Sequence, residues 1–234
     1  MVKKTTRAGQ VLTVDIPRPQ IKILSIPVVG ESRLVMHRWS KKAREQMLRK
    51  QMGMPALKKE KKDPHQDFLE SAYQSTEGWY GFPATAFKSA CVDACRYVEG
   101  ITMVMARGTL FVVPDGEDPE GISLVRIEGD GPHLREDMCR IDMGTADVRH
   151  RAEWRSWRTV INIKYNANIL TAAQVFNLAS IAGLHCGIGE GRPSAPKTSM
   201  DWGMFRLASE AECEIYSDLE TEPSATTTDL PAAA

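Results

Sequence analysis

The chain has 234 residues, with 30 Lys or Arg against 30 Asp or Glu, so its formal net charge is zero, and 42% of its residues are apolar. This composition is typical of a globular protein with a packed core. There is no apolar run of about 18 residues and no apolar signal segment near the start, so we expect a cytoplasmic protein without a membrane partner. Its five cysteines lack CxxC spacing, which predicts reduced thiols and no metal site.

Five elements are predicted in the first half of the chain. Alternating apolar residues predict a first strand, and an extended segment follows it. Ser40 is a suitable N-cap for a basic helix, and Pro83 is suited to the start of a later one. The strand, the extended segment and the three predicted helices lie, in chain order, over 21–29, 34–39, 41–52, 65–73 and 84–98.

The second half is predicted to contain strands and one further helix. Two strands are expected to form a hairpin around a turn rich in Gly, Pro and Asp, and Thr171 is expected to cap the helix. The hairpin strands, the next strand, the helix and the final strand are predicted over 101–113, 122–128, 158–169, 172–182 and 203–208. The final strand is expected to extend through residues 212–216.

Without its insertions, this order is βαββαβ, which predicts an α+β domain with a ferredoxin-like, RRM-like antiparallel sheet. Both helices should cover one face of that sheet. The expected organisation is a flexible N-terminus, one domain with two large insertions, and a disordered acidic tail. These parts span 1–17, then 18–216 with insertions at 31–82 and 129–156, and finally 217–234.

Positive and negative charges are separated along the chain. Residues 32–62 contain eleven Lys or Arg but only Glu45 and Glu60, whereas residues 207–234 contain seven acids and no base. This asymmetry predicts a basic binding surface and a separate acidic tail. The tail is expected to contact other proteins, to compete for the basic surface, or to act only as a solubilising extension.

A glycine-rich stretch over residues 183–193 follows the predicted helix 172–182 and ends near Arg192. Dense glycine permits positive φ and exposed amide groups, so one interpretation is an anion-binding loop completed by Arg192. The other is a helix C-cap that leads into a tight loop. A dinucleotide-binding turn is excluded because such a turn follows a strand and opens a helix.

No catalytic motif accompanies this loop. The sequence contains no Walker A motif and no Gly-x-Ser-x-Gly, and its histidines do not have HExxH spacing. Asp137, Asp142 and Asp147 flank arginines, and ion pairing is a simpler explanation for them than acid–base chemistry. We therefore predict no catalytic residues and no cofactor.

The predicted helix 41–52 carries most of the basic surface. It is expected to turn Ala43, Met47 and Leu48 toward the protein and its cations toward solvent, next to Trp39. Such cations attract phosphates, and an exposed aromatic ring stacks on a base for roughly 1–3 kcal/mol. The alternative is a solvated helix face with Trp39 in the core.

Four features of the sequence together carry a resemblance to known proteins. They are the strand near residue 21, the βαββαβ order, the segment His37-Arg38-Trp39-Ser40, and residues 187–192 before Gly203-Met204-Phe205-Arg206. Through these features the chain resembles phage and prophage proteins of unassigned role. Those proteins look like the RAMP superfamily, the RNA-binding backbone subunits of CRISPR surveillance complexes. The resemblance covers about residues 20–208. It implies a sheet with a large insertion, nucleic-acid binding at the glycine loop, and subunits stacked head to tail along a single strand in a bacterial host cell.

The leading functional prediction is a non-enzymatic protein that binds single-stranded DNA or RNA and oligomerises along it, in phage replication or recombination. Two alternatives remain open: a phage structural or assembly protein that forms rings or filaments, and an RNA-processing endoribonuclease of the RAMP type. The predicted contacts with nucleic acid are Arg38, Trp39, Lys41, Lys42, Arg44, Arg49, Gly187, Gly189, Gly191 and Arg192.

Overall fold

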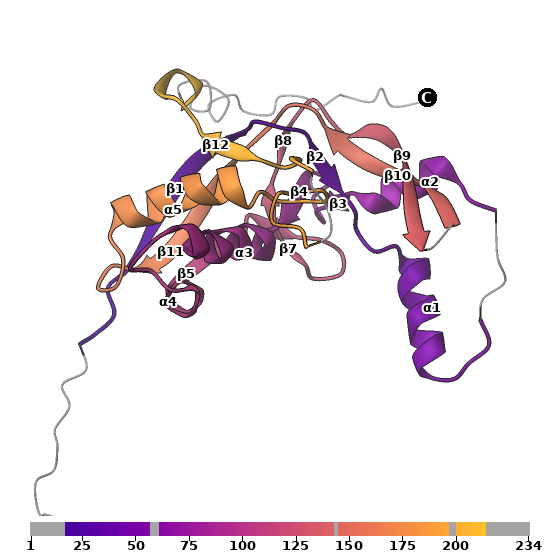
Figure 1. The fold of residues 1–234 in the computed structure, drawn as a ribbon, viewed down its shortest axis with the longest axis horizontal. Coiled ribbons are helices and arrows are strands. Elements are labelled where there is room, and N and C mark those ends of the chain that lie inside the picture. Colours follow the sequence, from indigo (N-terminus) through magenta and orange to yellow (C-terminus); the bar gives the residue numbers. More distant parts are fainter. Residues whose placement is uncertain (1–16, 57–60, 143–144, 197–199, 214–234) are drawn as a thin grey trace, which may run out of the picture.

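The computed structural model of the chain describes residues 17–56, 61–142, 145–196 and 200–213 (Figure 1). It combines helices with antiparallel sheets, in agreement with the predicted α+β class. The predicted acidic tail and residues 1–16 of the predicted flexible N-terminus lie outside the described residues. Within the described ranges, no helix has the length and apolar character needed to cross a membrane.

The main sheet is antiparallel and has the strand order β12-β1-β11-β5, with β8 also paired to β11. Along β11, side chains alternate between buried and more exposed, because successive residues of a strand point to opposite faces. Ile26 lies opposite Ile161 in the register of β1 and β11, and both side chains are buried. The strands are β1 (Ile21–Gly30), β5 (Leu110–Val113), β8 (Glu128–Gly129), β11 (Trp157–Asn166) and β12 (Phe205–Leu207).

Two helices pack against each other and against this sheet (Figure 1). They are α3 (Ala84–Ala94), which continues into the 3-10 turn η1 (Cys95–Tyr97), and α5 (Ala172–His185). Thr171 and Gln174 form a capping box at the start of α5, so this helix begins where the sequence predicts. Its buried face is formed by Val175, Leu178, Ala179, Ala182 and Gly183.

The first predicted insertion and part of the second form a separate sheet beside the main one (Figure 1). Its order is β2-β10-β9, and α2 packs against β10. Helix α1 projects from this region and has no buried residue. These elements are β2 (Leu34–Met36), α1 (Lys41–Gln51), α2 (Pro64–Ser71), β9 (His133–Asp142) and β10 (Thr145–Trp154).

A third small sheet joins the two parts with the order β3-β4-β7-β6. Its strands are β3 (Tyr73–Gln74), β4 (Tyr80–Pro83), β6 (Gly116–Glu117) and β7 (Ser123–Arg126). The predicted hairpin between 101–113 and 122–128 is therefore wrong, because β5 pairs with β11 while β7 pairs with β4 and β6.

Two other predicted segments differ from the structure. Most of the predicted strand 101–113 is helix α4 (Met103–Thr109), because the Thr102 side chain accepts a hydrogen bond from the Met105 amide and caps it. The expected strand beyond residue 208 is helical at residues 210–213, where Arg206 forms two hydrogen bonds with Glu212. Residues 214–216 of that prediction lie outside the described residues.

Candidate nucleic-acid interface

The glycine loop begins as the C-cap of α5. Gly187 has φ 61°, and its amide donates to the carbonyl of Ala182 at 2.9 Å. This left-handed residue after the last helical turn is the usual C-terminal capping arrangement. The predicted helix C-cap is therefore present, and it accounts for Gly187, the first of the three glycines that were predicted to contact nucleic acid.

Close packing inside the protein accounts for the other two. Gly189 and Gly191 both have positive φ. A Cβ at Gly189 would lie 2.8 Å from the carbonyl oxygen of Val35, and one at Gly191 would lie 2.5 Å from the ring of Trp202. The glycine loop, defined here as residues 187–194, thus fits tightly between β2 and the turn at residues 200–203.

Glu190 fastens this loop to the rest of the molecule. Its amide donates to the carbonyl of Val35, and its carboxylate accepts from His37 Nδ1 at 2.5 Å and from Arg151 Nη2 at 2.9 Å. Burial alone would raise the pKa of Glu190, but the hydrogen bond from His37 and the charges of His37, Arg151 and Arg149 outweigh it, so its pKa lies below the usual value. The carboxylate therefore serves as an ionised anchor.

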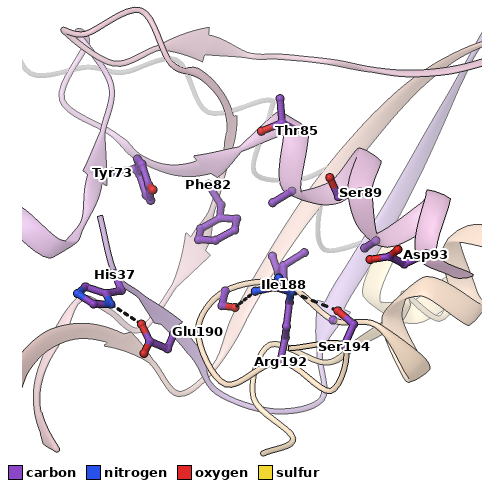
Figure 2. A pocket seen from close by; sticks show the side chains of 14 residues that line it. His37, Tyr73, Phe82, Thr85, Ser89, Asp93, Ile188, Glu190, Arg192 and Ser194 are labelled. Carbon is purple, nitrogen blue, oxygen red and sulfur yellow. Dashed lines mark hydrogen bonds and ion pairs between the residues drawn. The ribbon is translucent and has the colours of Figure 1, made fainter. Parts of the chain in front are cut away.

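Arg192 differs from the other arginines of the region in having only neutral partners. Its Nη1 donates to the carbonyl of Gly189 at 3.1 Å, and its Nε donates to Ser194 Oγ at 3.2 Å (Figure 2). Within the described part of the chain, Arg192 forms no ion pair with a carboxylate. The loop therefore fixes the orientation of this guanidinium group without neutralising its charge.

Arg192 lines a cavity of about 320 Å³ between the glycine loop and α3. Figure 2 shows His37 and Tyr73 at one side of this cavity and Ser89 and Asp93 of α3 at the other. The cavity is polar and open, so its surroundings suit a charged ligand more than an apolar one. We refer to it as the loop cavity.

A second cavity, of about 370 Å³, adjoins the loop cavity through His37, which lines both. It is lined by Trp39, Lys62, Arg149 and His150, among others, and we refer to it as the Trp39 cavity. The Trp39 side chain is 57% exposed, so the alternative that placed it in the core is wrong. The structure thus brings together two predicted segments that lie about 150 positions apart in the sequence.

The predicted cations near Trp39 fall into two groups. Arg38 pairs with Asp118 at 2.8 Å and with Glu120 at 3.0 Å, and Arg44 also pairs with Glu120. Arg49 pairs with Glu45 one turn earlier on α1. The charges of these three arginines are therefore largely neutralised by carboxylates of the protein itself.

The two lysines of the first turn of α1 are exposed, and among the described residues Lys41 forms no ion pair. The apolar residues of this helix are also exposed, at 45% for Met47 and 55% for Leu48, and Ala43 is only half-buried. The expectation that Met47 and Leu48 face the protein is therefore wrong, and no residue of α1 is buried.

Two of the three acidic residues considered for catalysis make ion pairs. Asp137 accepts from Arg135 and Arg151, and Asp147 pairs with Lys62. The side chain of Asp142 lies outside the described atoms. No group of three His, Cys, Asp or Glu suited to a metal ion occurs among the described residues.

Several residues of the site have no signal in the sequence. Lys62, Arg149, Arg151 and Glu190 join it through contacts between segments 39 to 153 positions apart. The only available hint was the alternation of charged residues over 147–153, which is the pattern of a polar strand. Sequence patterns report the conformation of a segment, and they do not report which distant segment it meets.

No protein-family model matches the chain, and no curated protein matches it either. Among solved structures, the crystal structure of Cmr6 from Pyrococcus furiosus is similar, with a TM-score of 0.39 and 13% sequence identity. The match covers 81% of this chain and 99% of that one. At this identity and TM-score, it carries no argument about the function of this chain.

Proposed function

We propose that this protein is a non-enzymatic nucleic-acid-binding protein that holds a single strand across the loop cavity and the adjoining Trp39 cavity. The observation that carries the proposal is Arg192, a positioned guanidinium group with neutral partners that lines a cavity next to an exposed tryptophan. Guanidinium groups bind phosphate with high geometric specificity, and an exposed indole ring stacks on a base of any sequence.

The other predicted contacts have different roles within this proposal. Lys41 and Lys42 supply exposed charge beside Trp39, whereas Arg38, Arg44 and Arg49 position the segment through their ion pairs. Gly187, Gly189 and Gly191 shape the loop that holds Arg192. The binding energy is expected to come mainly from release of counterions, so it should depend strongly on salt.

The wider identity of the protein is part of the same proposal. The strand order β12-β1-β11-β5, with antiparallel pairing, supports a ferredoxin-like reading of the main sheet over residues 18–216. We infer membership in the phage-type, RAMP-like group, assembly along the bound strand, and a role in phage replication or recombination in a bacterial host. The acidic tail is proposed to recruit other proteins or to restrain binding.

Fluorescence anisotropy with a labelled single strand at rising salt tests the proposal. Arg192→Ala should weaken binding and lower the slope of log K against log salt by about 0.7, the value of one lost phosphate contact on a single strand. Arg107→Ala, which removes an exposed charge on α4, is the matched control and should have no effect. The proposal fails if the wild-type protein does not bind at low salt or if its affinity is insensitive to salt.

One observation favours the alternative of a structural or assembly protein. Helix α1 has no buried residue and exposes Met47 and Leu48, and its C-cap residue Met52 is exposed as well, which is typical of a surface that binds a partner. Light scattering with and without a strand separates the two functions. Rings or filaments that form without nucleic acid would support the structural role, and assembly only with a strand would support binding.

The endoribonuclease alternative makes a separate prediction. It requires cleavage of RNA that is lost when Asp137, Asp142 or Asp147 is substituted. The ion pairs of Asp137 and Asp147 support a structural role for both residues. Intact RNA after long incubation would exclude the cleavage activity.

A further inference from the structure

A third cavity, of about 540 Å³, lies beside the glycine loop and belongs to neither of the two described above. It is lined by Arg33, Arg135, Arg155 and Trp202, and also by Glu31 and Asp201. Trp202 packs against Gly191 on the loop, and its amide donates to the Gly191 carbonyl. We call this space the arginine cavity.

One buried carboxylate lies within ion-pair distance of all three of its arginines. Glu153 is 3% exposed, and its Oε1 lies 2.8 Å from Arg33 Nη1 and 2.9 Å from Arg135 Nη1. Its Oε2 lies 3.7 Å from Arg155 Nε. Arg135 also bonds to Asp137, which is shared with Arg151. The acids in direct contact, Glu153 and the shared Asp137, therefore leave guanidinium charge on Arg33 and Arg155 only partly paired, and the carboxylates of Glu31 and Asp201, which also line the cavity, offset part of it.

That charge is accessible at two of the three side chains. Arg155 is 68% exposed and Arg33 is 45% exposed, so each presents unused N–H groups to the cavity. Glu31 and Asp201, which also line the cavity, form no ion pair with them in the described part of the chain. Because a hydrogen bond from Arg33 to Glu153 orients that guanidinium group in advance, a phosphate would bind at least one donor group that needs little reordering, with Arg155 beside it.

The third arginine and the tryptophan give the cavity a flat wall. The guanidinium carbon of Arg135 lies 4.4 Å from the centroid of the Trp202 ring, and its in-plane N–H groups are held by Glu153 and Asp137. A volume of about 540 Å³ is larger than a single phosphate needs and falls in the range of about 300–1,000 Å³ that small-molecule sites occupy. The space is suited to a phosphate with its attached nucleoside.

We propose that the arginine cavity binds one nucleotide unit of a single nucleic-acid strand, with the phosphate on Arg33 and Arg155 and the nucleoside against Arg135 and Trp202. This inference rests on the proposed function and adds a second contact site, on the other segment that packs against the glycine loop. In this proposal the carboxylates of Glu31 and Asp201, which also line the cavity, accept hydrogen bonds from a sugar hydroxyl or a base amino group.

The first measurement is strand binding by anisotropy over a range of salt. Arg155→Ala should weaken binding several-fold and lower the salt slope by about 0.7, as expected for one lost phosphate contact. Arg155→Lys keeps the charge and should restore most of the slope, while the control Arg107→Ala on α4 should match the wild type. An unchanged slope for Arg155→Ala would overturn the proposal.

The second measurement reports on the cavity directly, whether or not a strand binds elsewhere. The protein is labelled with 5-fluorotryptophan, its Trp202 resonance is assigned with Trp202→Phe, and thymidine 5′-monophosphate, thymidine, inorganic phosphate and an oligonucleotide are added in turn. We expect the Trp202 resonance to move with the mononucleotide and the oligonucleotide, to stay in place with thymidine, and to lose its response in Arg155→Ala.

The two proposals fail in different ways in this experiment. A strand whose binding depends on Arg192 but leaves the Trp202 resonance unmoved would overturn the nucleotide site and keep the proposed function. A Trp202 response to the mononucleotide in a protein that binds no strand would overturn the proposed function and the assignment to a strand together. An equal response to inorganic phosphate would assign the cavity to a free anion and would also overturn the proposal.

Discussion

Replacing Glu190 with Gln should loosen the glycine loop by a measurable amount. The substitution keeps the size of the side chain but removes the charge that accepts from His37 Nδ1 and from Arg151 Nη2. Hydrogen bonds to charged groups contribute about 1.5–3 kcal/mol, and an Arg151 side chain that is 3% exposed cannot turn to water for a replacement. Because the Glu190 side chain is itself 28% exposed, we expect a loss near the lower end, about 2 kcal/mol.

Urea unfolding measures this loss, and its pH dependence identifies the cause. The pKa of Glu190 is lowered in the folded state, so its contribution is present above the ordinary value of 4.5 and disappears as the pH falls through the lower folded pKa. The difference between wild type and Glu190→Gln should therefore shrink between about pH 6 and about pH 3. Glu210→Gln on the exposed surface is the control. An equal difference at both pH values would refute the role of the ionised carboxylate.

Two further predictions concern the close backbone packing at Gly203 and the burial of the Cys91 thiol. Gly203→Ala should unfold the protein or destabilise it severely, because its Cβ would overlap the carbonyl oxygen of Ile188. Gly100→Ala, which also has positive φ but meets nothing within 4 Å, should cost only about 1–2 kcal/mol, and urea unfolding compares the two. The Cys91 thiol should resist alkylation at about pH 8 in the native protein and react in urea, because burial raises its pKa to about 12. Mass spectrometry of alkylated Cys91 before and after unfolding checks this, and rapid labelling of the native protein would contradict it.

Local signals in the sequence predicted the elements that depend on local chemistry. Ser40 and Thr171 cap their helices through side-chain hydrogen bonds, as their residue types indicate. The apolar alternation of β1 and β11 located both strands of the sheet centre. The same reasoning missed the whole of α4 and predicted a strand there, because an apolar run with a few β-branched residues is equally compatible with a strand.

The hairpin of β9 and β10 was missed for a different physical reason. The face of these strands that turns toward the glycine loop is lined by charged side chains, among them Arg135, Asp137, Arg151 and Glu153, so it lacks the apolar alternation that marks a strand. Its side chains are stabilised by partners across the hairpin and on the loop. This charge complementarity can be recognised only when the positions of both strands are known. The arginine cavity, which is lined in part by these side chains, could therefore not be predicted from the sequence either.

The contacts of this hairpin explain how a chain with zero net charge can present positive surfaces. Ion pairs link Glu153, Arg135, Asp137, Arg151 and Glu190 in alternating sign, and each interior member is held by neighbours of opposite charge. The cations that remain incompletely paired lie at the two ends: exposed Arg33 and Arg155 at one, and Arg149, 3.9 Å from Glu190, at the other. Charge is therefore neutralised where burial would make it costly, and the incompletely paired cations lie at the more exposed ends of this series of ion pairs. This arrangement requires any anion bound at either end to compete with Glu153 or Glu190, so its affinity should be lower than at an arginine without a carboxylate partner.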